Sequence, residues 1–128
     1  MTDCEGTLHP RAREGLMLFN EGKYFEAHEE LEAAWRDERG KIRELYQGIL
    51  QAGVTYLHIT RGNYPGAIKV YRRSMRWLRN WPETCRGVEV GQLRNDLNAV
   101  IEEVKQLGES RIAEFNRNLL KPVVWKED

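Results

Sequence analysis

The stretch KIRELYQGILQAGVTYLHITR, residues 41–61, decides the fold because apolar residues occupy almost its whole helical circumference. Leu45 and Ile49 lie on one side of such a helix, and Tyr46 and Leu50 lie on another. A helix that is apolar all round is normally buried among other helices. We therefore expect this segment to be the central helix of a bundle.

Two glycines, Gly48 and Gly53, lie inside this central segment. A glycine in a helix interior costs about 1 kcal/mol relative to alanine. Their presence is explained if neighbouring helices approach the segment closely, so the two positions predict tight helix crossings.

Four more segments show apolar residues at helical spacing, bounded by proline or glycine. They run from Pro10 to Gly22, from Tyr24 to Gly40, from Pro65 to Leu78 and from Val90 to Leu107. Residues 109–120, ESRIAEFNRNLL, predict a short sixth helix, whereas residues 80–87, NWPETCRG, read as a linker. No strand-like alternation or hairpin signal is found.

The predicted fold class is therefore all-α, a compact bundle of about five to six helices. We expect a single domain over residues 1–128, with a loose N-terminus at residues 1–8 and an extended tail at residues 121–128.

An internal repeat indicates that the bundle is built from helical hairpins. Gly22, Tyr24 and Ala27 match Gly62, Tyr64 and Ala67 at a shift of 40 residues. In both copies a glycine ends one helix and Tyr-x-x-Ala opens the next. This resembles tetratricopeptide-type packing, so we expect two helical hairpins followed by a C-terminal helix. Chance similarity between two short helix starts is the alternative.

The charges of the chain cancel, because it has 20 basic and 20 acidic residues. It has no run of about 18 apolar residues, and its N-terminus lacks the pattern of a signal peptide. Cys4 and Cys85 are far apart and form no CxxC motif. We therefore expect a cytoplasmic protein with two free thiols and no overall attraction to nucleic acid or lipid.

The helix predicted from Tyr24 to Gly40 carries a histidine on its apolar side. On a helical wheel with Leu31 at zero, Trp35 falls at about 40° and His28 at about 60°. Glu32 falls at about 100°, at the edge of the apolar arc. Because His28 and Glu32 stand one turn apart, their side chains are close enough to hydrogen-bond or to share a ligand.

The central helix carries a narrow polar stripe, formed by Arg43, Gln47, Gln51 and His58. If the two helices are antiparallel neighbours, the polar sets face each other across a cleft walled by Trp35 and Phe25. The predicted ligand-binding residues are His28, Glu32, Trp35, Arg43, Gln47, Gln51 and His58. Buried polar groups need partners, so such a cluster is networked, hydrated or ligand-bound.

Three interpretations of this cluster stay open. In the first, the stripe faces solvent and Glu32 satisfies His28 at the edge of the core. In the second, the cluster is a pocket for a small polar ligand or a peptide. In the third, His28, Glu32 and His58 bind a divalent metal, although HEELE at residues 28–32 is not the HExxH zinc signature.

A catalytic role is also chemically feasible, because Glu32 can orient the His28 imidazole for acid–base chemistry. However, the chain has no nucleophile elbow, phosphate loop or dinucleotide fingerprint, and nothing in it indicates a cofactor. We therefore favour a binding module over a metal-assisted or acid–base, hydrolase-like enzyme. A structural protein that acts through its charged faces is the third class.

Charge is unevenly distributed along the chain. The helix that starts at Pro65 carries five basic residues within about 120° of arc. They are Lys69, Arg72, Arg73, Arg76 and Arg79, whereas the helix from Tyr24 is acidic. Such a basic face binds an acidic partner, RNA included, or is simply solvated. We expect a small ligand or a protein partner, not nucleic acid or a membrane, and the opposite charges leave self-association open.

Two blocks of the sequence resemble a known family of small bacterial and archaeal helical proteins, the domain of unknown function 309 family. They are FNEGKYFEAHEELEAAW at residues 19–35 and RELYQGILQAGVTYLHITRGNYPGA at residues 43–67, with a looser match at GVEVGQL, residues 87–93. The resemblance spans about residues 14–107 and implies an all-α bundle. It implies characteristic positions at His28, Glu32, Trp35, Gln47, Gly48, Gln51, His58, Gly62, Asn63, Gly66 and Ala67. It implies no activity or substrate.

Overall fold

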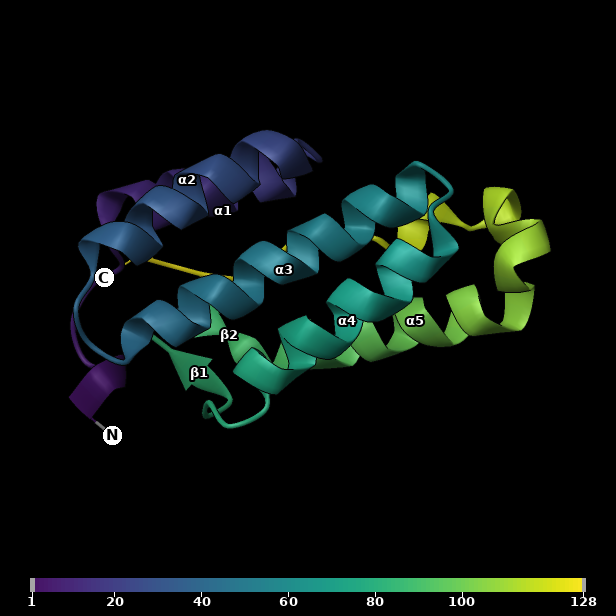
Figure 1. The fold of residues 1–128 in the computed structure, drawn as a ribbon. Coiled ribbons are helices and arrows are strands. Elements are labelled where there is room, and N and C mark those ends of the chain that lie inside the picture. Colours follow the sequence, from purple (N-terminus) through teal and green to yellow (C-terminus); the bar gives the residue numbers. More distant parts are fainter. Residues whose placement is uncertain (1, 128) are drawn as a thin grey trace.

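The computed structural model describes residues 2–127 and shows five α-helices within them (Figure 1). They are α1 (Pro10–Asn20), α2 (Tyr24–Asp37), α3 (Ile42–Thr60), α4 (Tyr64–Leu78) and α5 (Val90–Arg111). The all-α class predicted from helical periodicity is therefore confirmed. In place of the predicted sixth helix, Gly108 (φ 70°) interrupts the end of α5, and two 3-10 turns follow, η2 (Ile112–Glu114) and η3 (Arg117–Leu119).

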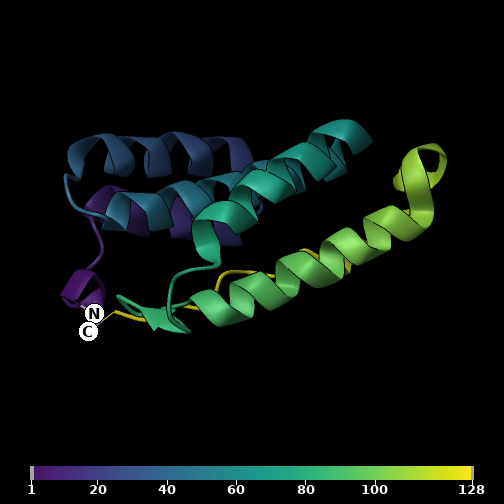
Figure 2. The ribbon, with the colours of Figure 1, turned by 60° about the horizontal axis from the view of Figure 1, so that its bottom comes forward.

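Helix α3 is the centre of the bundle. It packs against α2 on one side and α4 on the other, while α1 packs on α2 and α5 packs on α4 (Figures 1 and 2). Eleven of its residues are buried, which explains why its sequence is apolar nearly all round. No helix within residues 2–127 combines the length and apolarity that crossing a bilayer requires.

The two copies of the sequence repeat form equivalent corners. Gly22 (φ 80°) and Gly62 (φ 72°) both adopt the left-handed conformation that glycine tolerates. Ala27 and Ala67 are both fully packed, at 1% and 0% exposure. The chain thus forms the two predicted hairpins, α1–α2 and α3–α4, followed by α5.

The crossing of α3 and α4 is unusually close at Gly48. A Cβ atom at this position would lie 2.6 Å from Cδ2 of Leu78 and 3.3 Å from Cβ of Trp77. The hydroxyl of Ser74 donates a buried hydrogen bond of 2.8 Å to the Gly48 carbonyl. The tight crossing expected from this glycine is therefore present.

Gly48→Val is expected to lower the free energy of unfolding by about 1–3 kcal/mol, because Leu78 is fully buried and has no free space to enter. Urea unfolding followed by circular dichroism measures the change. Gly40→Val is the matched control, since no atom lies within 4 Å of a Cβ built at Gly40. Equal losses in the two variants would contradict a specific clash at the α3–α4 crossing.

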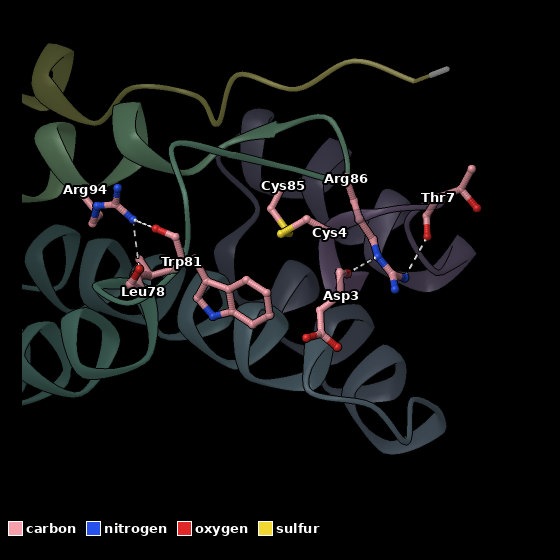
Figure 3. Close-up of a disulfide and its surroundings, with 8 residues drawn as sticks. All are labelled: Asp3, Cys4, Thr7, Leu78, Trp81, Cys85, Arg86 and Arg94. Carbon is pink, nitrogen blue, oxygen red and sulfur yellow. Dashed lines mark hydrogen bonds between the residues drawn. A yellow bond between two sulfur atoms is a disulfide. The ribbon is translucent and has the colours of Figure 1, made fainter. Parts of the chain in front are cut away.

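The N-terminal segment is fastened to the bundle, which corrects two expectations. Cys4 and Cys85 form a disulfide with Cα atoms 4.6 Å apart, so the prediction of two free thiols is wrong (Figure 3). Arg86 donates hydrogen bonds to the carbonyls of Asp3 (2.9 Å) and Thr7 (3.0 Å). Residues 2–8, which include the short helix η1 (Thr2–Cys4), are therefore not loose, while Met1 lies outside the described residues.

The segment predicted as a linker contains a small antiparallel hairpin instead. Strands β1 (Thr84–Cys85) and β2 (Val88–Glu89) pair around Arg86 and Gly87, which both have positive φ. Val88 also forms a bridge with Trp125 in the C-terminal tail. The tail is held against the bundle, because Val123 is buried, and Asp128 lies outside the described residues. Strands of two residues are too short to show alternation in a sequence.

Removing the disulfide is expected to destabilise the fold by about 2–4 kcal/mol, since it cross-links residues separated by 81 positions and so restricts the unfolded chain. The measurement is urea unfolding of the wild type with and without dithiothreitol. The double variant Cys4→Ser/Cys85→Ser should unfold at a lower urea concentration that reductant does not change. If the oxidised wild type and the double variant were equally stable, the bond would not contribute to holding the segment.

Candidate binding cleft between α2, α3 and α4

A hollow of about 310 Å³ opens where α2, α3 and α4 meet. Its lining residues are His28, Glu32 and Trp35 from α2, Gln47 and Leu50 from α3, and Trp77 from α4. Three polar side chains thus lie between two indole rings and one leucine. Clefts that combine apolar walls with a few convergent polar groups are typical binding sites.

Helix geometry explains why these residues meet. His28 and Glu32 lie one turn apart on α2, and Gln47 and Leu50 lie about one turn apart on α3. All four stand at the border between the buried face and solvent, and only Leu50 is fully buried. The structure therefore brings together four predicted residues, namely His28, Glu32, Trp35 and Gln47.

Glu32 is the electrostatic centre of the hollow. Its Oε2 lies 3.3 Å from Nε2 of His28, and its Oε1 pairs with the guanidinium of Arg36. The side chains of His28 and Glu32 are 32% and 33% exposed, so both remain within reach of a ligand. A carboxylate shared by two partners on its own helix is held in place, because each partner restricts its rotamers.

Arg43 fixes the indole of Trp35. Its guanidinium carbon lies 4.4 Å from the centroid of the Trp35 ring, and its Nε donates a hydrogen bond of 3.0 Å to the Trp35 carbonyl. This cation–π contact covers part of the ring. Arg43 therefore positions a wall of the hollow and does not line it.

A second hollow, of about 400 Å³, adjoins the first. Its lining residues are Trp35, Arg39, Gly40, Lys41, Arg43, Glu44 and Trp77. Because both hollows contain Trp35 and Trp77, they form one groove that passes over the two indoles. One end of this cleft groove carries His28 and Glu32, and the other end carries three cations and one carboxylate, that of Glu44.

Three residues predicted for the cleft lie elsewhere. Phe25 is 51% exposed, with its ring centroid 6.1 Å from that of His28, and does not form a wall. Gln51 does not line the hollow, and its Oε1 is buried without a hydrogen-bond partner among the described residues. His58 lies eleven residues after Gln47, about 16 Å further along α3.

The predicted metal set is therefore not assembled. Within residues 2–127, no group of three or more His, Cys, Asp or Glu side chains is arranged to hold a metal ion. His58 instead accepts a hydrogen bond of 3.1 Å at Nδ1 from the amide of Asn63, whose Oδ1 caps α4 through the Gly66 N–H. Because the amide nitrogen of Asn63 can only donate, Nδ1 of His58 is the acceptor, and Nε2 carries the proton of the neutral ring.

The residues that sequence reasoning missed are Leu50 and Trp77. Both read as core residues, because each stands at apolar helical spacing. Trp77 reaches the hollow only because α4 crosses α3 closely at Gly48. The sequence signal that could have identified Trp77 is therefore Gly48, which marks the close crossing, and not the spacing of the tryptophan itself.

His58 is expected to titrate at a lower pH than an ordinary histidine. Burial, and then the nearby charge of Arg61, lower the pKa of His58. Because the folded state disfavours the imidazolium, His58 stabilises the fold above the unfolded pKa of about 6.5, and this contribution is lost as the pH falls. NMR titration of the His58 ring gives the pKa directly.

Arg61→Gln should raise this pKa, whereas Arg39→Gln, at the other end of α3, should leave it unchanged. A titration of His58 at or above the ordinary histidine value would contradict the burial of its ring.

The fold and the cleft define a small helical bundle with a solvent-open groove, and part of the chain matches a known family. Residues 12–70 match the domain of unknown function (DUF309). This match confirms the resemblance seen in the sequence. The matched segment includes every cleft residue of α2 and α3 but not Trp77.

A relative in Aquifex aeolicus (strain VF5), an uncharacterized protein, is 27% identical over 108 residues. The aligned part covers 81% of this chain but 31% of that protein, so the chain spans less than a third of the relative's length. Neither the family nor this relative carries a described activity.

Proposed function

We propose that this protein is a binding module that holds a polar partner segment in the cleft groove across Trp35 and Trp77. The observation that carries the proposal is the placement of His28, Glu32 and Gln47 between two half-buried indoles. Tryptophans supply large rigid contact areas, and neighbouring polar groups fix the orientation of what binds.

The length of the cleft groove favours a segment of chain over a compact metabolite. A small ligand would fill one hollow, whereas here the two hollows adjoin across a shared pair of tryptophans. The charge changes along the groove, from the Glu32 end to the end with Arg39 and Lys41. A bound segment is therefore expected to carry donors or a cation at one end and an acidic group at the other.

The alternative is acid–base catalysis by His28 and Glu32, and it rests on their 3.3 Å approach. Two features favour binding instead. Arg36 pairs with Oε1 of Glu32, so one of the two carboxylate oxygens is already engaged. The lining of the first hollow also contains no hydroxyl, thiol or amine side chain, so it does not resemble a serine, cysteine or lysine nucleophile site.

A random 12-residue peptide library displayed on phage is the first probe, together with a metabolite panel read by thermal shift. We expect wild-type protein to enrich peptides whose binding changes tryptophan fluorescence. Trp77→Ala and Gln47→Ala should each weaken these peptides by roughly tenfold, since a central tryptophan is a typical hot spot and loss of the half-buried Gln47 amide leaves the polar group of the peptide unpaired.

Met17→Ala is the matched control, because Met17 is a large apolar side chain, 49% exposed, on α1 and outside the cleft groove. It should leave affinity unchanged. The proposal fails if no peptide or metabolite binds, or if the selected ligands tolerate both Trp77→Ala and Gln47→Ala.

A further inference from the structure

A second groove lies between α4, from Tyr64 to Arg76, and the C-terminal part of α5, two helices that run side by side (Figure 2). It encloses about 660 Å³. Its lining residues are Tyr64, Pro65, Ile68, Lys69, Arg72, Arg73, Arg76, Lys105 and Glu109. None of them lines the cleft groove, so this basic groove is a separate surface.

Five cations stand on the edges of the basic groove. Lys69, Arg72, Arg73 and Arg76 are exposed on α4, and Lys105 is exposed on α5. None of the five takes part in an ion pair within residues 2–127, although arginines elsewhere, such as Arg11 and Arg111, do pair with glutamates. The predicted basic face is thus not neutralised by the described part of the chain.

The floor of the basic groove is apolar. Tyr64 and Ile68 are half-buried, and Pro65 lies beside them. One turn further along α4, the Tyr71 hydroxyl donates a hydrogen bond of 2.6 Å to Asn98 of α5 and so ties the two helices together. Apolar side chains entering from outside would therefore find a preformed surface to cover.

The α5 edge decides which kind of anion fits. Glu109 lines the groove, and Glu102 is close enough to Tyr71 to raise its pKa, after the larger effect of burial. A phosphate backbone would meet these carboxylates and would leave the apolar floor uncovered. Base stacking also needs free aromatic faces, whereas Tyr64 is half-buried and Tyr71 is engaged with Asn98.

We infer that the basic groove binds an acidic amphipathic helix of a partner protein. Its apolar face would cover Tyr64 and Ile68, and its carboxylates would pair with the cations of α4. The groove follows α4 from Tyr64 to Arg76, about 18 Å, which corresponds to roughly three helical turns of the partner. Helices bound in grooves by residues at three- and four-residue spacing are a common recognition mode.

The test uses a synthetic, fluorescein-labelled peptide of about 14 residues, with leucines at helical spacing on one face and glutamates on the other. Fluorescence anisotropy measures its affinity for the wild-type protein. A peptide of the same composition in scrambled order carries the same charge without the apolar face. We expect the amphipathic peptide to bind at least about tenfold more tightly than the scrambled one.

Two double charge reversals, one inside the basic groove and one outside it, test whether binding depends on the groove or only on the net charge of the protein. Arg72→Glu/Arg76→Glu should weaken the amphipathic peptide by about tenfold or more. Arg79→Glu/Lys121→Glu changes the net charge equally at exposed residues outside the groove and should preserve binding. Ile68→Ser should also weaken binding, with circular dichroism confirming that each variant keeps its helical content.

Several results would overturn the inference. The scrambled peptide could bind as tightly as the amphipathic one, or the two double reversals could weaken binding equally. Single-stranded RNA or vesicles containing phosphatidylglycerol could bind more tightly than the peptide and lose affinity with Arg72→Glu/Arg76→Glu. Sedimentation could show that the groove is already occupied by a second copy of this chain. Because Trp77 and Gln47 lie outside the basic groove, these outcomes do not bear on the proposed function.

Discussion

At the crossing of α3 and α4, the backbone of Gly48 lies against Leu78 while the Ser74 hydroxyl bonds to the Gly48 carbonyl. This contact sets the distance between the two helices, because any side chain at position 48 would meet a fully buried leucine. It also brings Trp77 beside Gln47 and Leu50, where its indole closes the cleft. The cleft groove therefore depends on a residue that has no side chain and does not line the groove.

The charge of the molecule is distributed unevenly between its two grooves. The chain is neutral overall, yet the groove near α2 centres on Glu32 and the groove near α5 carries five cations. Charges on the surface of one small domain act mainly within about 8–10 Å at physiological ionic strength. Net charge thus says little about either surface, and each groove has to be judged from the charges that line it.

The helices and their order follow from sequence because helical periodicity and glycine turns are local signals. The all-round apolarity of residues 41–61 and the paired glycines at 22 and 62 identified the central helix and both hairpins. The β1–β2 hairpin and the disulfide depend on contacts between distant segments, since Cys4 and Cys85 are 81 residues apart and Val88 pairs with Trp125 of the tail. No local pattern encodes such a meeting.

The contrast between local signals and distant contacts also explains which residues of the candidate sites could be predicted. One helical wheel placed His28, Glu32 and Trp35 on a common arc, and pairing two neighbouring helices added Gln47. Phe25 and His58 were misplaced because a wheel ignores position along the axis and the tilt of the neighbouring helix. Trp77 and Ile68 are nine residues apart on α4, and therefore about 180° apart around it. Since α4 presents them to different grooves, the two surfaces do not overlap. Helix α4, packed on α3 through Gly48, is the element that both share.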